Sequence, residues 1–392
     1  MSCLWPNEVA IGDFCQTGSG GTPDRSRDEF YGGEIPWVKS GELREGLILD
    51  TEEHISELGL HNSSAKLVPA GALLVAMYGA TVGRLAILGC DAATNQAICN
   101  IRPDPSSADT RYLFRALEAK VPQLVSMAAG GAQPNISQDK IRKTRVPLPP
   151  LGEQRRIAAI LDKADALRQK RKRAIALLDS LTQSIFVEMF GDPAHNRLGL
   201  PVGKIGDLLE SATYGSSGKA GQIGAYPMLR MGNLTNNGQM DYADLKYIDL
   251  SEDEIDRYTV RRGDILFNRT NSAELVGKTA VFDRDEPYAF AGYLVRARTK
   301  SEFSPEYVSG YLNSPHGKKT LRGMAKSIVG MANINAKEMQ AIPILIPDQA
   351  SQRRYSETVE RIRARQSRYN GSLSVIQDLF SSLQHRAFSG QL

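Results

Sequence analysis

The feature that most constrains this 392-residue chain is an internal duplication. Short matches recur in the same order in both halves: residues 35–38 (IPWV) match 226–229 (YPML), and residues 154–156 (QRR) match 352–354 (QRR). The offset between partners grows along the chain, as expected of a tandem duplication that later gained small insertions. Chance matches would scatter instead. The sequence therefore predicts two diverged copies of one structural unit.

Each copy has the same succession of local patterns. Short apolar runs bounded by glycine, at residues 73–77 (LLVAM) and 265–267 (ILF), predict buried strands. Short helices are expected near residues 112–119 and 306–313. A mixture of strands and helices in this order predicts an α+β domain in each copy.

A long helix is expected to follow each copy. Proline-rich segments at residues 146–150 (VPLPP) and 342–347 (IPILIP) end the copies, because proline lacks a backbone donor and disfavours helix before it. Apolar residues then recur at alternating steps of four and three, which is a heptad pattern. The predicted helix-pairing residues are Ile160, Leu167, Leu178, Leu181 and Ile185 in the first helix, and Val359, Ile362, Leu373, Ile376, Phe380 and Leu383 in the second.

Two such apolar stripes in one chain are expected to pair, and the chain direction makes the pair antiparallel. We therefore predict an α+β protein with two similar domains separated by two long antiparallel helices and related by a pseudo-two-fold axis. The predicted boundaries are 1–150 and 193–349 for the domains, and 151–192 and 350–392 for the helices. In the alternative interpretation, each helix only caps its own domain.

Composition excludes several classes. The net charge of +4 allows nucleic-acid binding without arguing for it, so a DNA surface would have to be local. The cysteines, Cys3, Cys15, Cys90 and Cys99, form no C-x-x-C pair, so we expect neither a zinc site nor a disulfide scaffold. No apolar run is long enough for a membrane helix and no signal peptide is evident, so we expect a cytoplasmic protein.

Paired, non-identical domains at a fixed separation suit duplex DNA, whose grooves repeat every ~34–36 Å. Because the copies differ, the expected target is bipartite and asymmetric. A rival hypothesis makes the chain a protein-interaction scaffold that never reads bases. A third would make it a nuclease using Glu118 and Lys120, but these residues fall in a predicted helix, whereas that class of nuclease places them on strands.

Several motifs resemble those of the specificity subunit of type I restriction–modification systems. They are residues 18–23 (GSGGTP), 35–38 (IPWV), 94–97 (TNQA), 130–137 (GGAQPNIS) and 152–157 (GEQRRI). The resemblance implies a recognition subunit with no catalytic residues and no cofactor or metal of its own. It also implies double-stranded DNA as ligand, two modification subunits that methylate adenine with S-adenosylmethionine, and restriction subunits that use ATP and Mg²⁺.

The second copy departs from these motifs. Phe290 and Ala291 stand where the first copy has Asn95 and Gln96, and the glycine-rich opening is reduced to residues 215–218 (GSSG). The two domains are therefore not expected to share a base-reading code.

Base reading needs polar or cationic side chains that reach a groove edge, and phosphate contact needs Lys, Arg or backbone amides. Residues 268–271 (NRTN) directly follow a predicted strand and are the strongest cluster, although such residues are also common in ordinary turns. The predicted DNA-contacting residues are Thr22, Lys39, Ser40, Thr81, Arg84, Asn95, Gln96 and Gln133 in the first copy, and Arg230, Asn233, Asn268, Arg269, Asn271, Lys278, Lys326 and Asn333 in the second.

Overall fold

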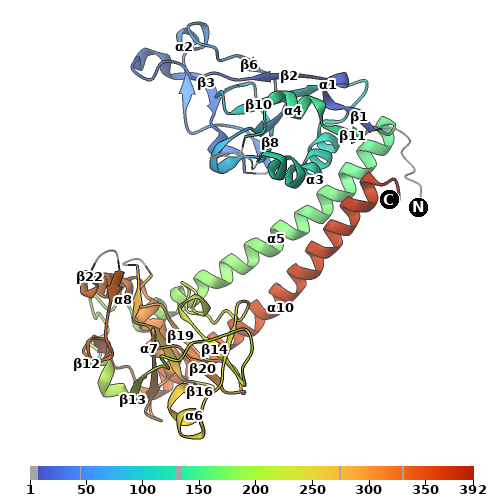
Figure 1. Cartoon of the computed structure of the whole chain (residues 1–392). Coiled ribbons are helices and arrows are strands. Elements are labelled where there is room, and N and C mark those ends of the chain that lie inside the picture. The colour runs from blue at the N-terminus through green and yellow to red at the C-terminus, as the bar shows by residue number, and fades with distance from the viewer. Residues whose placement is uncertain (1–7, 45, 129–134, 273–274, 329–330) are drawn as a thin grey trace. The chain divides into compact units, whose positions relative to one another are not determined.

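The computed structural model describes the chain except for residues 1–7, 45, 129–134, 273–274 and 329–330. The chain divides into two compact units: unit 1 comprises Met1–Lys170 with Leu373–Leu392, and unit 2 comprises Arg171–Ser372. The two boundaries between the units fall inside the long helices α5 (Leu151–Phe190) and α10 (Gln349–Phe388). Each unit therefore contains part of both helices (Figure 1). Within the described ranges, no helix is both long and apolar enough to span a membrane.

Unit 1 is built on two sheets and a two-stranded ribbon. Its other elements are β1 (Glu8–Ala10), α1 (Ile11–Phe14), β2 (Cys15–Ser19), β3 (Tyr31–Val38), β4 (Gly46–Ile48), β5 (His54–Ile55), α2 (Glu57–His61), β6 (Leu67–Val68), β7 (Leu73–Ala76), β8 (Leu85–Leu88), β9 (Ala92–Thr94), β10 (Ile98–Pro103), α3 (Thr110–Ala128), α4 (Gln138–Lys143) and β11 (Arg145–Pro147). One sheet has the order β2-β10-β7-β8-β4, the other has β5-β3-β9-β6, and β1 pairs with β11.

Unit 2 repeats this plan. Its elements are β12 (Val202–Lys204), β13 (Leu209–Tyr214), β14 (Tyr226–Leu229), β15 (Lys246–Ile248), α6 (Glu252–Tyr258), β16 (Thr259–Val260), β17 (Ile265–Asn268), β18 (Thr270–Asn271), β19 (Thr279–Val281), β20 (Tyr288–Phe290), β21 (Leu294–Thr299), α7 (Pro305–Asn313), α8 (Pro315–Met324), β22 (Lys326–Ile328), β23 (Met331–Asn333), α9 (Ala336–Gln340) and β24 (Pro343–Leu345). The sheets run β13-β21-β17-β19 and β15-β14-β20-β16, with a β12-β24 ribbon and a β18-β23-β22 sheet.

The sheet orders correspond strand for strand. The β2-β10-β7-β8 part of unit 1 matches β13-β21-β17-β19, and β5-β3-β9-β6 matches β15-β14-β20-β16, down to one parallel pair in each second sheet. Among described elements, β4 has no partner in unit 2 and the β18-β23-β22 sheet has none in unit 1, whereas the single helix α3 of unit 1 takes the places of both α7 and α8. The predicted α+β class with two similar domains and two long helices is confirmed.

A buried glutamine at the start of each long helix explains one repeated motif. Gln154 donates to the carbonyl of Pro149 (2.8 Å) and accepts from the amide of Asp109 at the start of α3 (2.8 Å). Gln352 donates to Pro347 (2.9 Å), and its side-chain oxygen accepts from the amide of Ser304 (3.0 Å) before α7. The glutamine therefore fastens the proline-rich exit to the short helix in both units.

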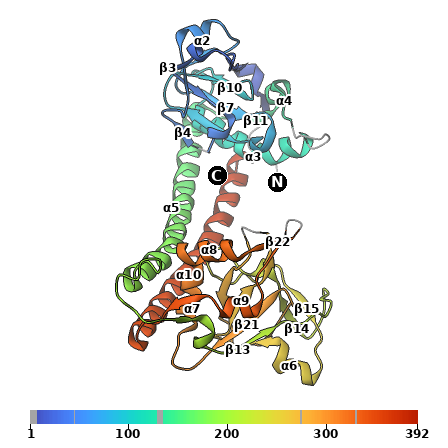
Figure 2. The same cartoon turned by 90° about the vertical axis from the view of Figure 1, so that its left-hand side faces the viewer.

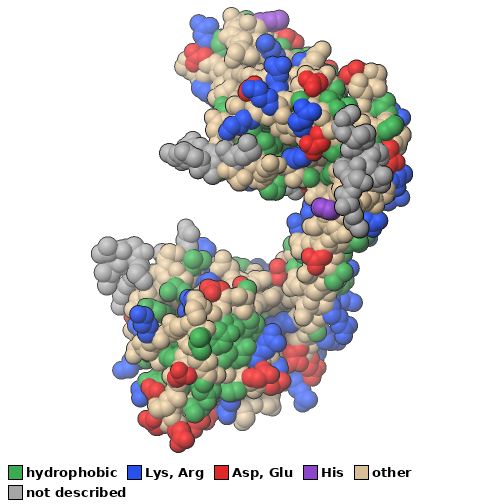
Figure 3. All heavy atoms as spheres, turned by 45° about the vertical axis from the view of Figure 1, so that its right-hand side comes forward, with side chains coloured by type: hydrophobic (Ala, Val, Ile, Leu, Met, Phe, Trp, Pro, Cys, Tyr) green, Lys and Arg blue, Asp and Glu red, His purple; other side chains and the backbone are tan. Residues whose placement is uncertain are grey.

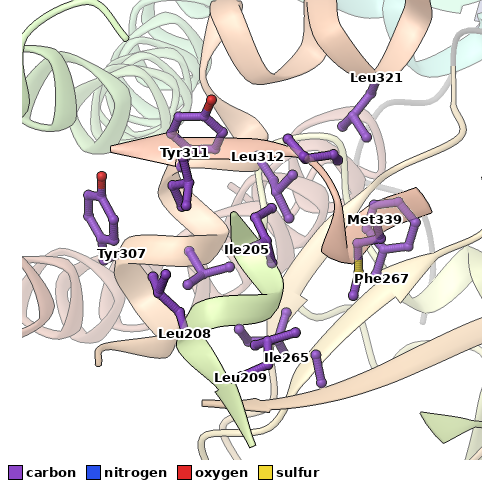
Figure 4. Close-up of a cluster of buried hydrophobic side chains, with 14 of the residues drawn as sticks. Ile205, Leu208, Leu209, Ile265, Phe267, Tyr307, Tyr311, Leu312, Leu321 and Met339 are labelled. Carbon is purple, nitrogen blue, oxygen red and sulfur yellow. The ribbon is translucent and has the colours of Figure 1, made fainter. Parts of the chain in front are cut away.

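The largest core lies in unit 2, between the β13-β21-β17-β19 sheet and the helices that cover it. Figure 4 shows part of it: Ile205 and Leu208 from the turn after β12 face Tyr307, Tyr311 and Leu312 of α7. The same cluster takes in Phe186 and Phe190 of α5 together with Tyr355 and Val359 of α10. The long helices are therefore part of the domain core and do not merely leave it.

The long helices run antiparallel within each unit. In unit 2, Arg171 lies over Tyr369 (4.3 Å), Asp179 accepts from Gln366 (2.7 Å), and Phe186 packs on Tyr355 (5.6 Å between ring centroids). In unit 1, Arg156 donates to the carbonyl of Leu392 and Arg168 lies over Phe380. In these contacts, higher residue numbers on α5 meet lower residue numbers on α10. The two helices can be followed by their colours in Figure 1 and Figure 2.

On α10, the predicted heptad positions face inward. Val359, Ile362 and Phe380 are buried, whereas Leu373, Ile376 and Leu383 are half-buried. Between them, Gln366 is also buried and donates to Asp179 of α5 (2.7 Å).

On α5, the inward face differs from the predicted one. Leu167 is 58% exposed and Leu181 is 40% exposed, while the buried positions near the start of the helix are Ile157, Leu161 and Ala164. The predicted positions Ile160, Leu178 and Ile185 are half-buried. The prediction was wrong for Leu167, because its neighbour Arg168 faces α10 instead and stacks on Phe380. Arg171, which falls on the predicted heptad spacing, does face α10 and stacks on Tyr369, and Asp179 binds Gln366.

Candidate nucleic-acid interface

The glycine-rich loop of unit 1 lies against the loop after β9. The amide of Gly21 donates to the carbonyl of Thr94 (2.9 Å), and the Trp37 indole donates to the carbonyl of Gly21 (3.0 Å). Thr22 can then hydrogen-bond its hydroxyl to the side-chain carbonyl of Gln96. The structure thus brings together Thr22 and Gln96, which are 74 residues apart in the sequence.

This close approach predicts a specific effect for Gly20→Ala. A Cβ at Gly20 would lie 1.9 Å from the carbonyl oxygen of Thr94, a distance that forces the backbone to move. We expect unit 1 to lose about 1–3 kcal/mol of stability and the Gly21 amide to exchange faster with solvent. Hydrogen exchange and denaturant unfolding measure both effects. Gly41→Ala, whose Cβ would meet nothing within 4 Å, is the control, and equal behaviour of the two variants would contradict the prediction.

Lys39, another predicted contact residue of unit 1, already forms ion pairs within the unit. It follows β3 directly, and its ammonium contacts Glu53 (2.8 Å) and Glu52 (3.3 Å). The hydrogen bond from Lys39 lowers the pKa of Glu53, and the same bond raises the pKa of Lys39. Ser40 is half-buried and begins the short helical turn that follows.

The connection between β7 and β8 holds two further predicted residues. Thr81 ends a helical turn and Arg84 is exposed before β8. The Met77 amide donates to the carbonyl of Ala97 (2.8 Å), so this connection lies next to Asn95 and Gln96. Asn95 uses its side-chain oxygen to accept from the Ala97 amide (3.2 Å).

The predicted residue Gln133 lies outside the described residues.

Unit 2 repeats the cation of Lys39 with a different residue. Arg230 follows β14 as Lys39 follows β3, and it pairs with Asp244 (2.8 Å) as Lys39 pairs with Glu53. The backbone amide of each cation donates to the third residue of the next turn, Glu42 (2.7 Å) or Asn233 (2.8 Å). A cation held by a carboxylate at the end of this strand is therefore common to both units. We call this shared arrangement, Lys39 with Glu53 and Arg230 with Asp244, the repeated frame.

Two predicted contact residues of unit 2 are not available to a ligand. Asn233 is buried and donates to the carbonyls of Asp241 (2.8 Å) and Asp244 (3.1 Å). Asn268 is also fully buried, so its side chain has no surface with which to reach a groove. The prediction was wrong for both, because a polar residue at a strand end serves equally well to close the loop behind it.

The remaining predicted residues of unit 2 converge on the β18-β23-β22 sheet. Thr270 and Asn271 pair with Asn333 and Ala332, and the strand residue Lys326 pairs in turn with Asn333. Asn333 is exposed and Asn271 is half-buried, with its side-chain oxygen accepting from the Ser272 amide (2.9 Å).

Arg269 lies at the edge of this sheet. Its guanidinium stacks over the ring of Tyr214 (4.9 Å) and contacts the carbonyl of Gly292 (3.4 Å). Lys278 lies directly before β19 and donates to the carbonyl of Leu234 (2.7 Å). Arg269 and Lys278 are each half-buried.

Sequence reasoning missed three further cations beside these edges. Arg25 is held by Glu53 (2.7 Å) and stacks over the rings of Tyr31 (4.6 Å) and Trp37 (5.0 Å). Lys318 and Arg322 of α8 lie beside Lys278. The sequence signal for Arg25 was its place two residues after the glycine-rich motif. The sequence signal for Lys318 and Arg322 was the helix that a Ser-Pro pair begins.

Other chemistry finds little support in the described residues. Glu118 pairs with Arg115 (3.0 Å) and Lys120 pairs with Glu8 (3.0 Å), so they do not form a shared nuclease site. No group of three or more His, Cys, Asp or Glu residues in these ranges is placed to hold a metal ion. On the face of the molecule seen in Figure 3, basic and acidic side chains are interspersed.

Comparison with known proteins bears on the same regions. The chain is 25% identical over 295 residues to the EcoKI type I restriction enzyme specificity subunit of Escherichia coli (strain K12), covering 69% of this chain and 62% of that protein. It is 29% identical over 180 residues to the HindI specificity subunit of Haemophilus influenzae, covering 44% and 39%. The alignments thus span less than two thirds of these relatives' length.

Solved structures share the fold. The S subunit of a type I restriction–modification system from M. genitalium superposes with a TM-score of 0.60 at 13% identity, covering 97% of this chain and 96% of that one. A family model, the type I restriction modification DNA specificity domain, matches residues 5–177 and again residues 200–370. Because these two matches cover both copies of the repeat and most of the sequence, this chain belongs to the type I restriction modification DNA specificity domain family.

Proposed function

We propose that this chain is the DNA specificity subunit of a type I restriction–modification enzyme and reads a bipartite, asymmetric target. Support comes from membership in a family named for DNA specificity and from relatives that are each named specificity subunits. In this proposal, residues 1–150 and 193–349 are the reading domains, and the helices of residues 151–192 and 350–392 set the gap between half-sites.

The observation that carries the proposal is that the two units share one backbone arrangement but present different side chains beside it. Both units place a carboxylate-held cation after the equivalent strand, Lys39 in one and Arg230 in the other. Next to that cation, Asn95 and Gln96 follow β9 in unit 1, whereas Ala291 and Gly292 follow the equivalent strand β20 in unit 2. The sequence comparison placed Phe290 and Ala291 there, but Phe290 is buried at the end of β20 and pairs with Leu229 as Thr94 pairs with Val38. Amide side chains can pair with adenine edges, whereas an apolar loop cannot, so the two units would recognise different bases.

Recognition is the whole mechanism assigned to this chain. Its partners would be double-stranded DNA, two modification subunits and restriction subunits. S-adenosylmethionine, ATP and Mg²⁺ would serve those partners, and the chain itself would bind no cofactor. An adenine must leave the stack before it can be methylated, so the chain would act by fixing the register of the methyltransferase on the duplex.

The proposed set of DNA-contacting residues is chosen by the accessibility of their side chains. It keeps those predicted residues that retain an accessible side chain, namely Thr22, Lys39, Ser40, Thr81, Arg84, Asn95, Gln96, Arg230, Arg269, Asn271, Lys278 and Asn333. It omits Asn233 and Asn268, which are buried, and it adds Arg25. Gln133 and Lys326 stay predictions, because their side chains lie outside the described part of the chain.

Mapping methylated adenines tests the function directly. The chain is co-expressed with the methyltransferase encoded beside it, and modified adenines are located across the host DNA. We expect one bipartite motif with a fixed gap, which disappears when this chain is deleted. Methylation that is absent, or unchanged by the deletion, would instead support the protein-interaction scaffold.

Domain exchange separates the two readers. Replacing residues 1–150 with those of a relative should change one half-site and leave the other half-site and the gap unchanged. A change in both half-sites would contradict the assignment of one half-site to each unit.

A further inference from the structure

A basic pocket in unit 2 has no role in the frame described above. It has a volume of about 130 Å³ and lies between α8, the Val276–Lys278 turn and Asn236. Three cations line it, Lys278, Lys318 and Arg322, and no lining residue is acidic. It lies entirely within unit 2.

The two lysine ammoniums are fixed at the floor of this pocket by backbone oxygens. Lys278 donates to the carbonyl of Leu234 (2.7 Å), and Lys318 donates to the carbonyl of Asn236 (2.6 Å). An ammonium has three donors, so each lysine retains donors for a ligand. Neighbouring carbonyls would thereby hold the cations in place before anything binds.

These cations lack the carboxylates that the repeated frame supplies elsewhere. Lys39 and Arg230 each contact a carboxylate within 3 Å, whereas the described residues form no ion pair with Lys278, Lys318 or Arg322. Burial lowers the pKa of both lysines, and the nearby Arg322 lowers that of Lys318 further. An anion in the pocket would relieve both effects.

The packing of the glycine turn on the neighbouring helix does not depend on charged side chains. In unit 1, Gly83 (φ +80°) approaches Val121 and Val125 of α3, and in unit 2 Gly277 (φ +81°) approaches Leu321 of α8 in the same way. The contact is apolar in both units, and α3 has no lysine or arginine at residues 121–126. The cations of α8 are thus an addition specific to unit 2.

We propose that Lys278, Lys318 and Arg322 form a binding pocket for a phosphate group. This inference rests on the proposed function for its expected source, a backbone phosphate of the DNA strand bound by unit 2. The position fits, because the backbone carbonyl of Lys278 accepts from the amide of Asn268 (2.8 Å), which precedes Arg269 at the proposed reading edge. A free phosphate anion shares the same chemistry and is the other source.

The test uses Lys318→Gln combined with Arg322→Gln, in the complex of the full chain with its methyltransferase. Binding to the mapped target is measured from about 0.05 to 0.3 M salt. Loss of one phosphate contact should lower the slope of log K against log salt by about one and weaken binding roughly tenfold at low salt. Lys204→Gln removes an exposed lysine of unit 2 that does not line the pocket and should change neither value.

A second arm distinguishes the sources and guards against misfolding. The full chain is melted without DNA in inorganic phosphate or in chloride of equal ionic strength, and Lys318→Arg serves as the conservative variant. A smaller salt slope supports DNA phosphate as the ligand, and stabilisation by phosphate of the wild type but not of the double variant supports a free anion. If neither differs between wild type and double variant, the pocket is not a phosphate site. Failure of the wild type to bind any specific DNA would overturn the proposed function, while the melting arm would still decide on the pocket.

Discussion

Replacing Phe186 with alanine is expected to destabilise unit 2 by about 3–5 kcal/mol. The Phe186 ring is fully buried at the end of α5, where it lies 5.2 Å from Phe190, 5.7 Å from Tyr307 and 5.6 Å from Tyr355 between centroids. Removing it leaves a cavity and breaks three aromatic contacts at once. Because these rings come from α5, α7 and α10, the loss should loosen both long helices where they meet this domain.

The measurement has to resolve the two units, because two domains need not unfold together. Trp37 is buried in unit 1, so the change in its fluorescence reports that unit, and hydrogen exchange follows amides of unit 2. Val187→Ala is the control on the same turn of the helix, since Val187 is 41% exposed. Equal destabilisation by both variants would mean that the ring cluster does not hold α5 in place.

Replacing Arg115 with methionine is expected to cost unit 1 about 3–5 kcal/mol. The Arg115 side chain is 7% exposed on α3 and contacts Glu118 (3.0 Å), Asp162 (2.9 Å) and Asp165 (3.2 Å). Methionine keeps much of the packing volume but leaves these carboxylates facing one another without their cation. The packing of α3 on α5 should therefore weaken.

The same variant should show a particular pH dependence. Burial raises the pKa of Glu118 above its ordinary value, and Arg115 opposes this rise. A carboxyl group with a raised pKa in the folded state must give up its proton at a cost to folding, so its penalty grows as the pH rises from its unfolded-state pKa to its folded-state pKa and is fully present above the latter. Without Arg115 the pKa rises further, so the destabilisation should be largest near pH 7 and smaller near about pH 5.

Urea unfolding at both pH values checks this prediction. Arg111→Met is the matched control, because Arg111 lies one turn earlier on α3, also faces Asp162 (3.7 Å) and is 75% exposed. It should cost less than about 1 kcal/mol and show little pH dependence. A loss for Arg115→Met that is small, or equal at both pH values, would contradict the buried-network explanation.

The sequence was sufficient for the repeated plan but not for the inner face of α5. Apolar spacing at residues 73–77 and 265–267 located β7 and β17, and the proline-rich exit followed by the heptad pattern located α5 almost to its ends. Heptad counting succeeded on α10, where most inward positions are apolar. It was wrong for Leu167 and Leu181 on α5, which are exposed, because Arg168 supplies its apolar contact through stacking on Phe380, which a hydrophobicity pattern does not register.

The candidate interface was predictable in outline only. Loop positions with suitable side chains could be named, and Thr22 and Gln96 do meet. Whether a polar residue faces outward depends on which loop packs behind it, and sequence spacing does not contain that information. Asn268 turned inward for this reason, while Arg25 gained an anchored position from Trp37 and Glu53, neither of which is its sequence neighbour.

The repeated cation–carboxylate pair has a consequence for the ancestry of the chain. Lys39 with Glu53 and Arg230 with Asp244 occupy matching places although all four residue types differ. A pairing kept while both members changed was inherited from a single ancestral domain, older than the divergence of the copies. The residues that distinguish the copies, such as Gln96 and the cations of α8, differ because at least one copy changed after the duplication. Such changes left the paired cation and carboxylate in place in both units.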